Sequence, residues 1–122
     1  MNKSQAVVLG ALDTARAVVE VAGDKLASDV VLFDMCGSCG YADYIVLANG
    51  ESTRQLEAIA DDVVHALKQK DVYLLHREGT AASGWLLLDF SDVVVHIFAP
   101  DERAYYKLDN LWSTARPIMR LA

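Results

Sequence analysis

Two cysteines stand at a spacing that could support redox or metal chemistry. Cys36 and Cys39 form a Cys-x-x-Cys pair after an expected strand, as in redox motifs and half zinc sites. A structural zinc site needs four ligands, there is no second cysteine pair, and nothing in the pattern fixes His65, His76 or His96 near this loop. In thioredoxin-like proteins the second cysteine opens a helix, whereas here a strand follows within a few residues. We therefore interpret the pair as loop cysteines, and predict no metal and no cofactor.

A second group is typical of nucleotidyltransferases. Gly37-Ser38 precedes an expected strand, and Asp43 stands close to where those enzymes carry an Asp-x-Asp pair. The paired carboxylates would hold Mg²⁺ ions that bridge the nucleotide phosphates. Here Ile45 occupies the second acidic position, so the pair is broken. A residual nucleotidyltransferase or nucleotide-binding protein remains the alternative function, because a fold of that type does not carry the activity with it.

The third group is an acid and a histidine in the stretch from Trp85 to Phe98. Asp89 could orient His96 as a general base. The expected turn at Ser91-Asp92 makes the two residues diagonal, and no nucleophile is evident. We interpret them as polar groups on a binding face.

The stretch Trp85–Phe98 is expected to form two strands joined by a two-residue turn. Side chains alternate along a strand, so the hairpin has two faces. One is wholly apolar and comprises Leu86, Leu88, Phe90, Val93, Val95 and Ile97. The other comprises Trp85, Leu87, Asp89, Val94, His96 and Phe98. Either a helix covers this second face and its polar groups are buried and satisfied, or the face binds a partner through aromatic anchors.

Hydrophobic periodicity predicts the elements that position these groups. We expect a helix over 4–22 capped by Ser4, strands over 30–35 and 44–48, a helix from Ser52 to about 70, a strand over 72–75, a loop over 76–84, the hairpin, and a last helix from Pro100 that Pro117 ends. The predicted fold is α/β: a single domain over 1–122, with a mixed sheet of about five strands packed with helices.

Composition narrows the class of protein. With 122 residues and 53% apolar side chains the chain can bury a core. Its 11 basic and 17 acidic residues give a net charge of −6, which argues against nucleic acid as the main contact and suits a basic protein partner. We find no signal peptide and no apolar run near the ~18 residues of a membrane span, so we expect a cytoplasmic protein that does not contact membranes.

Several motifs, in order over roughly residues 5 to 115, resemble the ribosomal silencing factors, also called the Iojap-like family. The stretches that carry the resemblance are Ala42–Gln55, Ile59–Asp61, His76–Gly79, Trp85–Asp89, Asp92–Phe98 and Arg103–Trp112.

The resemblance implies a nucleotidyltransferase-like fold without enzymatic activity. It implies binding to the large ribosomal subunit through the basic ribosomal protein L-fourteen, which blocks joining of the small subunit and damps translation in starvation or stationary phase. A homodimer that hides the same face in the free protein is a further reading. The partner-binding surface would carry over onto Trp85, Asp89, His96, Tyr105, Leu108 and Trp112.

Overall fold

The computed structural model describes residues 10–35, 42–106 and 116–121. In chain order the elements are α2 (Ala11–Asp24), β1 (Ser28–Asp34), β2 (Tyr44–Asn49), α3 (Thr53–Lys68), β3 (His76–Thr80), the short 3-10 helix η1 (Ala81–Ser83), β4 (Trp85–Asp89), β5 (Val93–Phe98), α4 (Pro100–Tyr106) and β6 (Arg116–Leu121).

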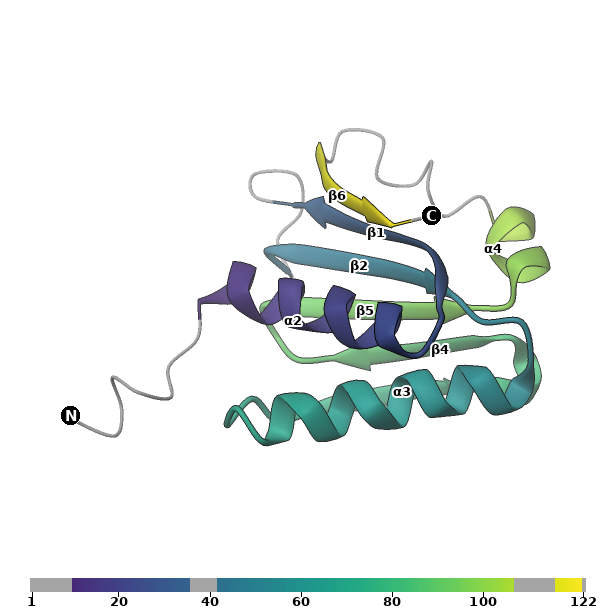
Figure 1. Cartoon of the computed structure of the whole chain (residues 1–122), viewed down its shortest axis with the longest axis horizontal. Coiled ribbons are helices and arrows are strands. Elements are labelled where there is room, and N and C mark those ends of the chain that lie inside the picture. Colours follow the sequence, from purple (N-terminus) through teal and green to yellow (C-terminus); the bar gives the residue numbers. More distant parts are fainter. Residues whose placement is uncertain (1–9, 36–41, 107–115, 122) are drawn as a thin grey trace.

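These strands form one six-stranded sheet in the order β3-β4-β5-β2-β1-β6. The central pair, β2 and β5, is parallel, and every other pair is antiparallel. Helices α2 and α3 lie side by side on the same face of the sheet (Figure 1). The predicted α/β class with a mixed sheet is confirmed, with one strand more than expected. No helix in the described part of the chain is long and apolar enough to span a membrane.

Helix α2 forms over the later part of the stretch that the pattern predicts to be helical. In the described residues it begins at Ala11, with extended Gly10 at the N-cap position, whereas the expected start at Ser4 lies outside them. The helix runs through Asp24, past its expected end at residue 22. Its apolar side packs on the sheet through Ala15, Val18, Val19 and Ala22.

The start of α3 is where the sequence places it. The Ser52 side-chain oxygen accepts a hydrogen bond from the Gln55 amide at 3.0 Å, which satisfies one of the unpaired donors of the first turn. The Gln55 side chain reaches back to the Glu51 amide at 2.6 Å, one residue before the position of a standard capping box. It also donates to the Lys25 and Leu26 carbonyls, which ties α3 to the end of α2.

The predicted strand over 72–75 is wrong, and the predicted loop over 76–84 contains the real strand, β3. Val72 and Leu74 pack against the core outside any strand. The tight connection through η1 places His76–Thr80 antiparallel to β4, with Thr80 opposite Trp85. All five β3 residues are exposed, because β3 is an edge strand. Such a strand needs no apolar pattern, so periodicity could not reveal it.

The predicted helix end at Pro117 is also wrong. Pro117 lies in β6, opposite Phe33 of β1. A proline lacks the amide donor, and a sheet tolerates it on an edge strand such as this one. Helix α4 begins at Pro100 as predicted and reaches Tyr106, and residues 107–115 lie outside the described part of the chain.

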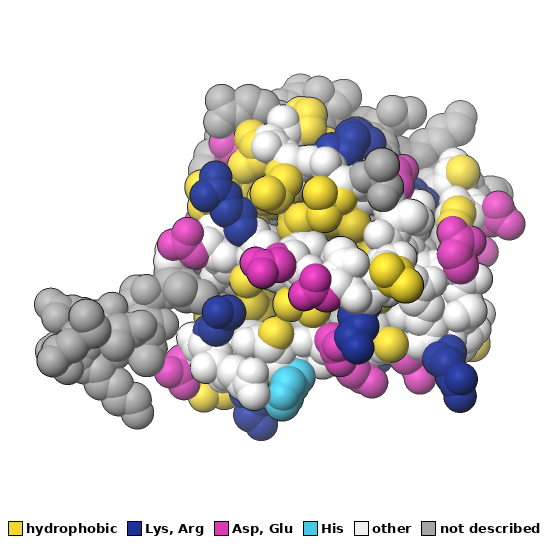
Figure 2. Space-filling view, viewed as in Figure 1, with side chains coloured by type: hydrophobic (Ala, Val, Ile, Leu, Met, Phe, Trp, Pro, Cys, Tyr) yellow, Lys and Arg dark blue, Asp and Glu magenta, His cyan; other side chains and the backbone are white. Residues whose placement is uncertain are grey.

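Acidic and basic side chains are interspersed over the side of the molecule that carries the helices (Figure 2). Apolar side chains gather above α2, towards β6 (Figure 2). The exposed large hydrophobic residues of β6 are Ile118, Met119 and Leu121.

Candidate partner-binding surface

The β4–β5 hairpin has the predicted register. Trp85 pairs with Phe98, Leu87 with His96, and Asp89 with Val94. The Phe90 amide donates to the Val93 carbonyl, which closes a turn of two residues. The six apolar residues predicted for one face are all buried in the core beneath α2 and α3, and we call this the helix face. The residues that form the opposite face, here named the aromatic face, are Trp85, Leu87, Asp89, Val94, His96 and Phe98.

Exposure on the aromatic face decreases from the edge of the sheet inwards. On β3 the residues in register with it, His76, Glu78 and Thr80, are exposed. On β4 its three residues are half-buried, and on β5 its three residues are buried. The face therefore offers solvent a strip along β3 and β4, backed by buried side chains on β5.

Three rings form a cluster at the end of this face that is farther from the turn. The Trp85 and Phe98 ring centroids are 5.3 Å apart, with the planes at 41°. The His96 and Phe98 rings are stacked at 5.8 Å with an interplanar angle of 2°, and Trp85 lies 6.0 Å from His96. Offset and tilted aromatic pairs at these distances add to the stability gained by burying their area.

His96 is neutral in this setting. Its side chain is 5% exposed, and burial lowers its pKa from 6.5 to about 4. The Trp85 indole N–H donates a hydrogen bond to its Nδ1 at 3.1 Å. Because Nδ1 accepts, the ring proton of neutral His96 must be on Nε2. A histidine with so little exposed surface and so low a pKa is poorly placed to act as a general base on a substrate in solvent.

Asp89 shapes the turn of the hairpin. Its Oδ1 accepts a hydrogen bond from the Ser91 amide at 2.7 Å, and Ser91 adopts a φ of +80°. An aspartate that bonds the backbone two residues ahead favours such a tight turn. Asp89 therefore has a structural task in addition to the partner-binding role predicted for it.

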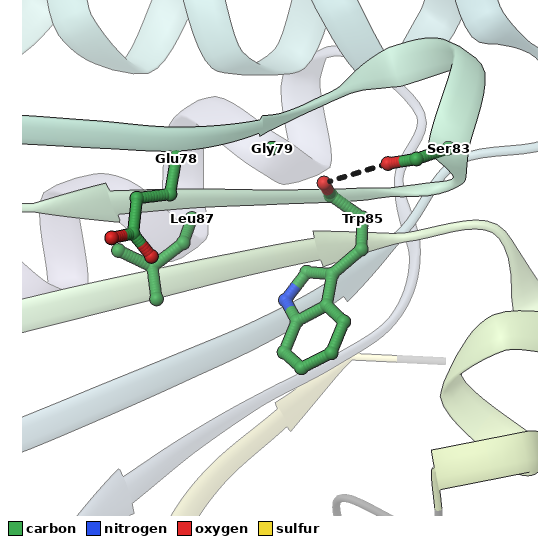
Figure 3. A pocket seen from close by; sticks show the side chains of 5 residues that line it. All are labelled: Glu78, Gly79, Ser83, Trp85 and Leu87. Carbon is green, nitrogen blue, oxygen red and sulfur yellow. Dashed lines mark hydrogen bonds between the residues drawn. The ribbon is translucent and has the colours of Figure 1, made fainter.

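A shallow pocket of about 220 Å³ opens beside Trp85. The side chains of Glu78, Leu87 and Trp85 extend to the same side of the sheet (Figure 3). Ser83 lies next to Trp85, in the connection between β3 and β4. Gly79 has a φ of +82°, and a Cβ there would stand 2.2 Å from the Trp85 carbonyl oxygen, so the close approach of β3 to β4 needs a glycine. The pocket is mostly apolar with one carboxylate at its rim.

Three of the six predicted partner-binding residues thus lie on one face: Trp85, Asp89 and His96. Tyr105 lies on α4, and its side chain is outside the described part of the structure. Leu108 and Trp112 also lie outside the described residues.

The pattern did not reveal the role of Arg103, which is 5% exposed. Its Nη1 donates to the Asp29 carbonyl at 2.7 Å and to the Asn49 side-chain oxygen at 2.9 Å. The Asp29 carboxylate accepts from Arg120 at 3.1 Å, and Asp29 itself has a φ of +49°. The Arg103 contacts fasten α4 to β1 and β2, and the Asp29–Arg120 pair links β1 to β6. Arginine at this place in α4 carries no sequence signal for burial, because its partners are distant in the chain.

In the part of the chain that the structure describes, the residues of the catalytic alternatives are not brought together into a site. Ile45, at the position of the missing second acid, is fully buried, whereas Asp43 is exposed. Cys36 and Cys39 lie outside the described residues. Within the described ranges no group of three or more His, Cys, Asp or Glu side chains is placed to hold a metal ion.

Comparison with known proteins identifies relatives over most of the chain. The ribosomal silencing factor RsfS of Halalkalibacterium halodurans is 38% identical over 97 residues, which are 80% of this chain and 83% of that protein. A mouse protein named mitochondrial assembly of ribosomal large subunit protein 1 is 31% identical over 109 residues, covering 86% of this chain and 47% of the mouse protein. A crystal structure of a Chromobacterium violaceum protein matches with a TM-score of 0.83 at 28% identity, covering 93% of this chain and 95% of that one.

The model of one protein family matches nearly the whole chain. That family is described as "Ribosomal silencing factor during starvation", and the match runs over residues 9–121. It includes both strands that bear the aromatic face and the helix that Arg103 anchors. The chain therefore belongs to the family of ribosomal silencing factors.

Proposed function

We propose that this protein is a translational repressor, not an enzyme, that binds the large ribosomal subunit through the basic ribosomal protein L-fourteen. Binding there sterically blocks joining of the small subunit and damps protein synthesis in starvation or stationary phase. The protein acts in the cytoplasm, where its target subunits are. Membership of the ribosomal silencing factor family supports the ribosomal target, and the name of the mouse relative supports the large subunit.

The observation that carries the proposal is the half-buried Trp85 on the accessible strip of the aromatic face. A tryptophan at the edge of a pocket offers a large contact area and a fixed shape, and tryptophan is enriched among residues that dominate binding energy. Exposed polar side chains lie beside it on β3, where Thr80 pairs with Trp85 and Glu78 with Leu87, as at the rim of a typical interface.

Electrostatics favours a basic partner. The net charge is −6, and two exposed acids lie along the strip, Glu78 at its middle and Asp92 at the turn of the hairpin. Complementary charge mainly raises the association rate and the specificity, whereas the aromatic contact supplies most of the affinity. Binding is therefore expected to weaken moderately as salt concentration rises.

The test is cosedimentation with purified large ribosomal subunits. Trp85→Ala is expected to weaken binding at least about tenfold, as the loss of a central aromatic anchor does. Tyr73→Ala is the matched control, because Tyr73 is an aromatic residue 54% exposed outside the aromatic face. Circular dichroism checks that both variants are folded. Normal cosedimentation of folded Trp85→Ala would contradict the assignment of this surface.

A second measurement addresses the mechanism. Small subunits are added to large subunits preloaded with the protein, and joined ribosomes are separated by centrifugation. Steric occlusion predicts that the wild-type protein lowers the joined fraction and that Trp85→Ala does so much less. Light scattering of the isolated protein tests the related proposal that a homodimer covers the same face when no ribosome is present. A strict monomer at high concentration would exclude the homodimer.

A further inference from the structure

A hydrogen bond to His96 fixes the rotation of the Trp85 indole. Its direct cross-strand neighbour is Phe98, and the contact of the rings is apolar. His96 lies diagonally across the strand pair, opposite Leu87, and its Nδ1 receives the indole N–H. A ring contact alone allows an indole to slide and turn, whereas a hydrogen bond at one atom fixes its edge.

The acceptor is itself held in place. The His96 ring is stacked on Phe98 with nearly parallel planes, and the side chain is buried. Burial keeps the imidazole neutral, so Nδ1 retains the lone pair that accepts the indole proton. A buried, stacked ring can contribute little surface of its own to a partner, but it can hold a more exposed neighbour.

We propose that His96 is a positioning residue, which holds the Trp85 indole in the orientation that the partner contacts without touching the partner itself. This inference rests on the proposed function, in which Trp85 is the aromatic anchor. A side chain that is ordered before binding does not lose rotational freedom when the complex forms, so its affinity is higher.

Two substitutions at His96 separate the acceptor from the bulk of the ring. His96→Asn places a side-chain oxygen near the position of Nδ1 and keeps an acceptor. His96→Phe keeps an aromatic ring against Phe98 and removes the acceptor. In cosedimentation with large subunits, His96→Phe is expected to bind about tenfold more weakly, and His96→Asn to stay within about threefold of wild type.

A double-mutant cycle tests whether His96 acts through Trp85. Trp85→Phe removes the indole donor and retains an aromatic ring. It therefore also tests the hydrogen bond if His96→Phe does not fold. If His96 acts only through the indole, adding His96→Phe to Trp85→Phe costs no further affinity. If the two losses add, His96 acts independently of Trp85 and the inference is overturned.

A spectroscopic readout does not depend on the ribosome. The indole N–H resonance of Trp85, assigned by its loss in Trp85→Phe, is expected to exchange faster with solvent in His96→Phe and to stay protected in His96→Asn. Unchanged exchange in folded His96→Phe would overturn the inference. If the wild-type protein fails to bind large subunits, the proposed function fails, and the resonance still reports whether His96 holds the indole. Binding by wild type and His96→Phe with equal affinity would leave the proposed function standing and overturn the inference.

Discussion

The two faces of the β4–β5 hairpin are built from the same strands but meet different structural requirements. On the helix face Leu86, Leu88 and Ile97 lie against α2 and α3. These apolar side chains need only fill the space between the sheet and the helices. On the aromatic face Trp85 and His96 carry polar atoms that must be paired when they are withdrawn from water, so their orientation matters as well. The first face supports stability, and the second combines stability with an ordered surface strip.

The largest expected effect is on the free energy of unfolding, and it is seen by comparing two adjacent leucines. Leu88 is fully buried on the helix face, whereas Leu87 is half-buried on the aromatic face beside the pocket. Leu88→Ala should lower the free energy of unfolding by about 2–5 kcal/mol, because it leaves a cavity in the core. Leu87→Ala should cost clearly less, since solvent already reaches its site. Urea denaturation measures both values, and equal losses would show that the two faces are packed alike.

The next effect is a pH dependence that belongs to the aromatic face alone. The pKa of His96 is about 4 in the folded protein and near 6.5 in the unfolded chain. Between these values only the unfolded state takes up the proton, so the stability contributed by neutral His96 is fully present above pH 6.5 and is lost as the pH falls towards 4. The full loss is about 3 kcal/mol.

Urea denaturation at pH 7 and pH 4.5 measures most of this loss. Carboxylates also titrate in this range, so His96→Asn supplies the reference and should lose less stability on acidification. His76→Asn controls for the substitution itself at a histidine whose side chain is 57% exposed. A wild-type profile that matches His96→Asn would mean that the buried imidazole is not held neutral by the fold.

The smallest effect separates the faces functionally. Ser52→Ala removes the cap of α3, which covers the helix face, and should cost about 1 kcal/mol of stability. Cosedimentation with large subunits should be unchanged, because Ser52 caps α3, which packs on the helix face, whereas Trp85 belongs to the aromatic face. Weaker binding by this variant at a temperature where it is folded would show that the two faces are not independent.

Sequence reasoning succeeded where the determining interactions are local. The period of two, together with a two-residue turn at Ser91-Asp92, correctly predicted every pair of the hairpin. Likewise, Ser52 and Gln55 are three positions apart, and this capping pattern correctly predicted the start of α3. The resemblance, rather than the periodicity, pointed to Trp85 as a residue of a binding surface.

Sequence reasoning failed where strand pairing or burial depends on partners far along the chain. The exposed residues of β3 are a strand only because β4 pairs with them, and β6 joins β1 across most of the sequence. Arg103 is buried because Asn49 and Asp29, 54 and 74 positions away, accept its hydrogen bonds. No local pattern in an arginine-containing helix distinguishes such a residue from one that faces solvent.

The position of β6 at one edge of the sheet has a consequence for how the molecule folds. Trp85 and His96, at the other side of the sheet, are 11 positions apart, whereas the ion pair between Asp29 and Arg120 joins residues 91 positions apart. Closing the longer loop costs about 2 kcal/mol more chain entropy than closing the shorter one. Contacts of long range also form slowly. The hairpin that bears Trp85 is therefore expected to form early in folding, and the edge that receives β6 to be completed late.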